Sequence, residues 1–157
     1  MKYKLLIALI VFINSSFYAQ EISKIEFHHS NSLITFSSID ITFEPIKNNT
    51  KEKIKIRVKK GRENEYYSEI SKTKFFKIYN ACMKIKNDTV AVKNNLVDGS
   101  ATNITLYDKS GTKTNYYAEG LTKESRDNRF QKDFWYVTKL IIKVAGLKME
   151  DLTGYKY

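Results

Sequence analysis

The sequence contains few of the residues that cross-link or interrupt a chain: one cysteine, one proline and six glycines among 157 residues. The single cysteine excludes an intramolecular disulfide and the cysteine clusters that hold structural zinc. Hydrophobic residues make up 42% and charged residues 28% of the chain, which is the balance of a globular domain rather than of a disordered or fibrous protein. At this length one hydrophobic core supports a stable fold without a metal or a disulfide.

Long hydrophobic runs are also missing, because the one purely apolar stretch, residues 5–13, is shorter than the roughly 20 residues that cross a bilayer. It follows two lysines and precedes a polar stretch ending at Ala19-Gln20, which is the pattern of a cleaved secretory signal. This ending resembles those common among exported proteins of Gram-negative bacteria. We therefore expect removal of residues 1–19. Residues 20–157 should then form one exported domain without a transmembrane segment, soluble in the periplasm or outside the cell.

The clearest secondary structure signal lies at residues 54–59, where Ile, Ile and Val alternate with Lys, Arg and Lys. This period of two predicts a strand with one buried face and one exposed face. Residues 65–70 are expected to return as its hairpin partner, and a helix from about 72 to 86 should follow with Ser71 as its N-cap. The apolar face of this helix is predicted to consist of Phe75, Phe76, Tyr79, Cys82 and Met83.

A similar order recurs in the second half of the chain. Strands are expected near 101–107 and 114–119 around a turn at Gly111, followed by a helix over about 128–145 that Gly146 ends. The apolar stripe of this helix is predicted to contain Phe130, Phe134, Val137, Ile141 and Val144. At a spacing of 50 residues, six positions are identical: Ile54/Ile104, Lys59/Lys109, Gly61/Gly111, Tyr66/Tyr116, Tyr67/Tyr117 and Glu69/Glu119. These identities are consistent with an internal duplication of a hairpin and a helix, with repeats at 53–86 and 101–146.

Two further strands, residues 22–28 and 33–43, precede the first repeat, with a turn at Ser30-Asn31 and a break at Ser37-Ser38, where the alternation changes phase. Val90 and Val92 indicate a short additional strand, and the tail from 151 to 157 is expected to fray. The whole pattern predicts an α+β domain in which one antiparallel sheet carries two helices on a single face.

Lys and Arg total 27 against 17 Asp and Glu, which gives a formal net charge of +10 and favours acidic partners. If both helices cover one face of the sheet, the other face is open to solvent or to a ligand. By strand parity we expect this open face to be basic, with a candidate binding set of Lys55, Arg57, Lys59, Tyr107 and Lys109. Lysines in such positions also commonly serve only to keep a sheet solvated.

A second candidate binding region is the loop from 120 to 129, which carries charges of both signs just before the long helix. Loops hold functional residues more often than cores do, and guanidinium groups suit carboxylate ligands. Its candidate residues are Lys123, Arg126 and Arg129. The same loop also fits a solvated connection with Asp127 or Asn128 as the cap of the helix.

Catalytic and metal-binding patterns are scarce. The two histidines, His28 and His29, are adjacent, so on a strand they point to opposite faces and do not address one metal ion together. Cys82 falls in the apolar stripe of the first helix, where a free cysteine acts as a small hydrophobe. No zinc-protease motif, nucleophile elbow, phosphate-binding loop or dinucleotide fingerprint is present. The sequence therefore favours a protein that is not an enzyme and uses no metal or cofactor.

These observations lead to the hypothesis of a small exported binding or inhibitor-like module for an acidic protein or an anionic envelope polymer. Nucleic acid is not an expected partner, because export separates the protein from it and no RNA-binding motif is present. One alternative is a hydrolase of envelope polymers that uses paired carboxylates such as Asp40 and Glu44. The other is a structural accessory of an envelope assembly, for which an apolar patch on the open face is expected.

Overall fold

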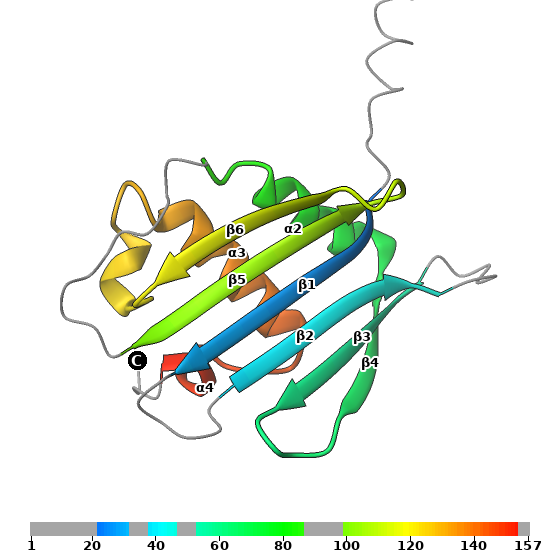
Figure 1. Ribbon diagram of the computed structural model, residues 1–157, viewed down its shortest axis with the longest axis horizontal. Coiled ribbons are helices and arrows are strands. Elements are labelled where there is room, and N and C mark those ends of the chain that lie inside the picture. Colours follow the sequence, from blue (N-terminus) through cyan, green and yellow to red (C-terminus); the bar gives the residue numbers. More distant parts are fainter. Residues whose placement is uncertain (1–21, 32–37, 47–52, 87–98, 154–157) are drawn as a thin grey trace, which may run out of the picture.

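Six strands, each with one buried and one exposed face, form a single antiparallel sheet (Figure 1). The computed structural model describes the chain in four ranges: 22–31, 38–46, 53–86 and 99–153. The strands are β1 (Ile22–Asn31), β2 (Ser38–Pro45), β3 (Lys53–Lys60), β4 (Tyr66–Ser71), β5 (Ser100–Asp108) and β6 (Lys113–Glu119). Their order in the sheet is β4-β3-β2-β1-β5-β6, and every neighbouring pair is antiparallel.

Two long helices, α2 (Lys72–Cys82) and α3 (Lys132–Val144), pack against one face of this sheet and lie behind it in Figure 1. Two short elements, the 3₁₀ helix η2 (Lys123–Arg126) and α4 (Glu150–Thr153), flank α3. Apolar side chains from every strand and both long helices fill the space between the layers. The largest fully buried ones include Phe27, Phe43, Phe75 and Phe134. The predicted α+β fold with two helices on one face is confirmed.

The first helix begins as the sequence predicts and buries a partly different face. The Ser71 hydroxyl accepts a hydrogen bond from the Lys74 backbone N–H, which is the predicted N-cap. The α-helix ends at Cys82, and Met83, expected in the core, is 54% exposed. The residues of α2 that reach the core are Phe75, Ile78, Ala81 and Cys82. Ile78 lies three residues after Phe75, so the buried line follows a different side of the helix from the predicted one.

The second helix begins later than predicted, at Lys132. The Asn128 side chain accepts a hydrogen bond from the Phe130 N–H, which holds this segment in a local turn before the helix. Phe130 consequently lies outside α3 and is 46% exposed, whereas the sequence placed it in the core. Phe134, Val137 and Ile141 are buried as expected.

The helix end at Gly146 follows the prediction. Gly146 has a positive φ of 76°, and the Leu147 N–H donates to the Ile142 carbonyl, which closes the Schellman motif that ends many helices. The start of the tail corrects another expectation, because Leu152 in α4 is 1% exposed and docked instead of frayed, whereas residues 154–157 lie outside the described residues. A buried side chain there anchors the segment that follows α3.

The first strand runs further than the sequence indicates. Ser30 and Asn31, expected to form a turn, continue β1 and lie opposite Ala101 and Ser100 of β5. Long-range pairing with β5 therefore overrides their local turn preference. The predicted break at Ser37, the strand at Val90 and Val92, and the signal at residues 1–19 lie outside the described residues.

A hairpin followed by a helix does occur twice, as β3-β4-α2 and as β5-β6 followed by α3. The two hairpins differ in register. Ile54 lies opposite Ile70, whereas Ile104 lies opposite Tyr116, which is the sequence counterpart of Tyr66. The identical residues of the two hairpins consequently do not occupy equivalent cross-strand positions.

Candidate functional site

The predicted open-face residues do not form one group. Lys55, Arg57 and Lys59 alternate outward along β3, as their parity predicts. Tyr107 also points to this face from β5, but β2 and β1 separate it from β3. Lys109 lies in the turn after β5. Only the three β3 residues are therefore neighbours.

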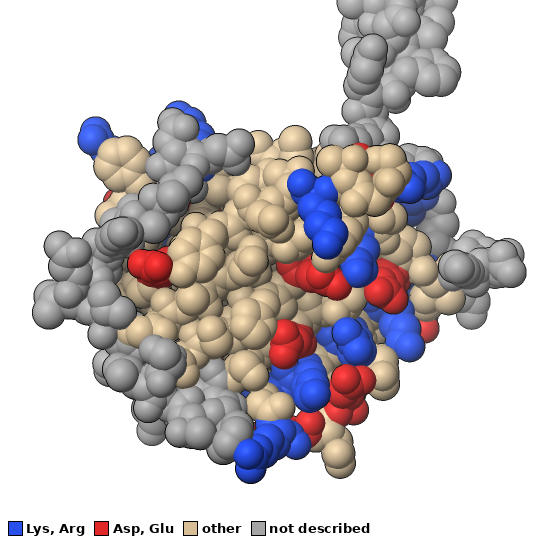
Figure 2. Space-filling view, in the orientation of Figure 1, with Lys and Arg blue, Asp and Glu red and all other residues tan. Residues whose placement is uncertain are grey.

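The open face balances its charges instead of being basic. Figure 2 shows acidic and basic side chains intermixed on this face. The acidic ones come from the strands beside β3 and from β1 and β6, since Asp40 lies opposite Lys59, and Glu69 lies opposite Lys55. In the part of the chain that the structure describes, six basic residues point to this face: Lys24, Lys53, Lys55, Arg57, Lys59 and Lys113. Six acidic residues accompany them: Glu26, Asp40, Glu44, Glu65, Glu69 and Glu119.

Glu26 organises the centre of this face. Its carboxylate accepts hydrogen bonds from the Lys24 ammonium group at 2.7 Å and from the Tyr107 hydroxyl. Partial burial would raise the pKa of Glu26, but these two bonds outweigh it and lower the pKa. The hydrogen bond between Tyr107 and Glu26 also raises the pKa of Tyr107. In addition, the Lys24 nitrogen makes a cation–π contact with Tyr107, at 4.1 Å from the centre of its ring. Contacts with Glu26 and Lys24 of the neighbouring strand β1 therefore fix the position of the Tyr107 side chain.

A hollow of about 380 Å³ on the same face is lined by one histidine, His28, and by the three carboxylates of Glu26, Asp40 and Glu65. His28 Nδ1 lies 2.7 Å from Asp40 Oδ1, and both side chains are about half exposed. Glu44 lines a different hollow, so Asp40 and Glu44 share no cavity of the kind the hydrolase hypothesis needs. Among the described residues, no three His, Cys, Asp or Glu side chains are grouped so as to hold a metal ion.

The uncharged part of the open face is polar. The Thr105 hydroxyl donates to the Asn115 side-chain oxygen at 2.8 Å across β5 and β6. Asn103 and Tyr117 lie opposite each other beside them. These amide and hydroxyl groups occupy the region where an apolar patch would support a structural accessory role.

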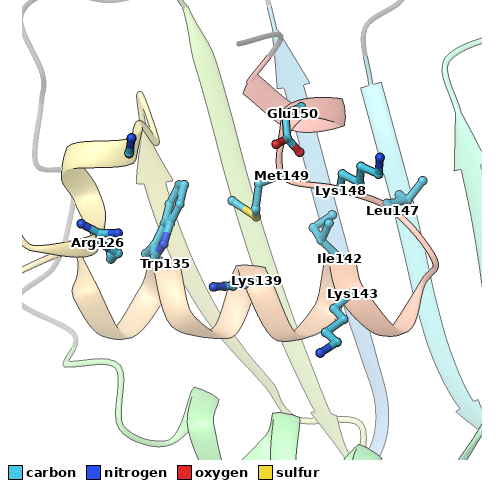
Figure 3. A pocket seen from close by; sticks show the side chains of 10 residues that line it. Arg126, Trp135, Lys139, Ile142, Lys143, Leu147, Lys148, Met149 and Glu150 are labelled. Carbon is cyan, nitrogen blue, oxygen red and sulfur yellow. The ribbon is translucent and has the colours of Figure 1, made fainter. Parts of the chain in front are cut away.

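A second surface, on the side of the sheet that the helices cover, carries more basic than acidic side chains. A hollow of about 360 Å³ lies between η2, α3 and the segment 147–150 (Figure 3). Five of the side chains that line it are basic: Lys123, Arg126, Lys139, Lys143 and Lys148. Glu150 is the acidic side chain in its lining. We call this hollow the basic pocket.

The floor of the basic pocket is apolar. Trp135, Ile142 and Met149 point into the space between η2 and α4 in Figure 3, and Leu147 completes the lining. The turn at Gly146 brings residues 147–150 back beside α3 to make one wall. Trp135 is only 7% exposed, so its ring is fixed by the core and contributes an edge to the floor. The pocket thus combines a cationic rim with a rigid apolar base.

Most of the rim cations are available to a ligand. Arg126 is paired with Asp127, with nitrogen–oxygen distances of 2.9 and 3.2 Å, and this hydrogen bonding raises the pKa of Arg126. Within the described ranges, Lys139, Lys143 and Lys148 take part in no ion pair. Unpaired ammonium groups attract anions.

The basic pocket includes part of the predicted loop site. Lys123 and Arg126 line it, whereas Arg129 lies over the Phe130 ring at 4.4 Å and is not in its lining. Sequence reasoning missed Lys139, Lys143 and Lys148. The signal for the first two was present, because Trp135, Lys139 and Lys143 are spaced four residues apart and share one side of a helix.

No helix in the described parts of the chain is both long and apolar enough to cross a membrane. No protein-family model matches the chain, and no curated protein sequence matches it significantly.

Proposed function

We propose that this protein is an exported binding module, inhibitor-like in role, that recognises an acidic protein partner through the basic pocket. The observation that carries the proposal is the pocket lining, in which five basic side chains and one acidic side chain surround an apolar floor. The pattern of a secretory signal in residues 1–19 supports export.

The ligand chemistry follows from the rim and the floor together. Lysine ammonium groups bind carboxylates through charge-assisted hydrogen bonds. Ile142, Leu147 and Met149 offer apolar contact to a side chain placed between those carboxylates. A uniformly charged sugar polymer has no such apolar group, and Trp135 is too buried to offer its ring face for stacking. These features favour an acidic protein segment over an anionic glycan.

The open face is less suited to this role because several of its basic side chains already have acidic partners, as Lys24 does in Glu26. Lys53 contacts Glu69 at 2.6 Å, and Arg57 contacts Glu65 at 3.6 Å. An acidic partner would have to displace these carboxylates before it gained new contacts. The unpaired lysines of the basic pocket carry no such penalty.

A cross-linked pull-down from envelope and secreted fractions, read by mass spectrometry, tests the proposal. The captured protein is then purified, and its dissociation constant is measured by calorimetry against two variants with equal changes of charge. Lys139→Glu with Lys143→Glu alters the basic pocket, and Lys55→Glu with Lys59→Glu alters the open face. We expect the pocket variant to weaken binding by about tenfold or more, and the control by less than about twofold.

Two results would contradict the proposal. Loss of binding in the open-face variant alone would move the site to β3. If neither fraction contains a stoichiometric acidic protein, the partner class is wrong. Binding of a uronic acid polymer, measured with the same two variants, would then identify a glycan ligand.

A further inference from the structure

A second groove lies on the other side of α3 from the basic pocket. It has a volume of about 600 Å³ and runs between the two long helices. The region of α2 supplies most of its lining, namely Thr73, Phe76, Lys77, Asn80, Ala81 and Lys84, and α3 supplies Tyr136. We call it the interhelical groove.

Aromatic side chains give this groove a fixed apolar strip. The Phe76 ring makes edge-to-face contacts with Phe75 at 5.9 Å and with Tyr79 at 6.5 Å between ring centres. These contacts hold Phe76 in place at the helix surface. Tyr136, across the groove, is 48% exposed. The partly buried Phe76 ring and the exposed Tyr136 ring therefore lie at one site.

The charged side chains in the lining of this groove are both lysines. Residues 72–86 contain five lysines and no acidic residue. Lys77 and Lys84 line the groove, and neither takes part in an ion pair among the described residues. They are seven residues apart in the sequence, with Lys77 inside α2 and Lys84 two residues beyond its end at Cys82.

We propose that the interhelical groove binds an acidic amphipathic helix of a protein partner. Charge complementarity selects this occupant, because carboxylates seven residues apart on one face of a helix offer one partner each to Lys77 and Lys84. An apolar side chain between those carboxylates reaches the strip of Phe76 and Tyr136. The inference rests on the proposed function only in the acidic character of the partner, and it names a separate surface and a helical ligand.

The basic pocket and the interhelical groove are lined by different residues of α3, although some of these residues are neighbours in the sequence. Trp135 and Lys139 line the basic pocket, and Tyr136 lines the interhelical groove. Variants confined to one site therefore leave the lining of the other unchanged. This separation makes failure of the groove and failure of the basic pocket distinguishable.

The probe is a synthetic 18-residue helical peptide with two glutamates seven residues apart and a leucine midway between them. A control peptide has glutamine in place of both glutamates. Binding to the whole protein is measured by fluorescence anisotropy of the labelled peptide, and amide chemical shifts locate the contact. We compare Lys77→Glu with Lys84→Glu, Lys72→Glu with Lys74→Glu as the charge-matched control on the same helix, and Lys139→Glu with Lys143→Glu.

We expect the groove variant to weaken binding of the acidic peptide by about tenfold or more, and the other two variants by less than about twofold. The glutamine peptide should bind the unaltered protein correspondingly more weakly. Circular dichroism melting shows whether each variant is folded, and Tyr136→Ala, at an exposed position, tests the apolar contact without a change of charge.

Equal weakening by the groove variant and the Lys72/Lys74 control would overturn the proposal, since it would indicate attraction to total charge. Unchanged binding in the groove variant would overturn it too. Weakening only in the Lys139/Lys143 variant would place the peptide in the basic pocket. If the pull-down yields no partner while the peptide binds the groove as expected, the proposed function fails and the groove inference stands.

Discussion

The buried imidazole of His29 joins the central strand to the end of the chain, with Nε2 lying 2.9 Å from the carbonyl oxygen of Leu152. A carbonyl oxygen only accepts, so Nε2 carries the hydrogen, and Nδ1 accepts from the Thr102 hydroxyl at 2.9 Å. His29 is 1% exposed, which makes both bonds costly to lose. These bonds hold α4, which begins at the end of the segment 147–150 that forms one wall of the basic pocket.

Replacing His29 by alanine is expected to lower the free energy of unfolding by about 2–4 kcal/mol, because the change leaves a cavity and two unpaired buried groups. His28 is the matched control, since its contact with Asp40 is half exposed. His28→Ala should lower stability by less than about 1 kcal/mol. Urea unfolding of both variants measures the difference, and equal effects would show that His29 does not anchor α4.

The carboxyl group of Asp151 should make the free energy of unfolding depend on pH in the acidic range. Its carboxylate accepts a hydrogen bond from the Lys148 backbone N–H and contacts Lys60 at 3.1 Å, and these interactions lower its pKa. A lowered pKa means that the charged form stabilises the fold at neutral pH and that this stabilisation is lost as the pH falls. We expect Asp151→Asn to lower stability by about 1 kcal/mol at pH 7.

The difference between Asp151→Asn and the unaltered protein should shrink as the pH falls below about 4. Unfolding by urea across this pH range provides the measurement. Asp127→Asn is the control, because Asp127 is exposed and its ion-pair partner among the described residues is its sequence neighbour Arg126. A difference for Asp151→Asn that stays constant with pH would contradict the assignment.

The Cys82 thiol should be unreactive in the native protein. Burial raises the pKa of Cys82 to about 12, and the side chain is fully enclosed by the core. Only about one Cys82 thiol in ten thousand is then ionised at pH 8, and an alkylating reagent in solution has no access to the buried sulfur. Mass spectrometry after iodoacetamide treatment is expected to find no alkylation until the protein is denatured. Rapid labelling under native conditions would show that α2 opens.

The lysines of the basic pocket should contribute nothing to stability. Lys139→Gln with Lys143→Gln removes two like charges from a crowded site, so we expect unchanged stability or a gain of up to about 0.5 kcal/mol at low salt. The gain should disappear at high salt. Lys53→Gln, which removes a contact with Glu69, should give no gain. A marked loss of stability in the pocket variant would show that these lysines are structural.

Local patterns in the sequence predict much of the architecture. The alternation along residues 54–59 produces β3, the side chains of Phe134, Val137 and Ile141 form the buried face of α3, and His28 and His29 do point to opposite faces. These features depend on periods of two and 3.6 residues, which the backbone imposes on any chain. They also suffice for the α+β class.

The tertiary structure alone decides the charge of each surface and the position of the sites. Register sets Asp40 opposite Lys59, so the face expected to be basic is balanced. Packing brings η2 beside Lys139 and the segment 147–150, which are separate in sequence, and so creates the basic pocket. Contacts between distant segments depend on how whole elements pack and pair, whereas a sequence pattern reports only each residue's own side of its strand or helix.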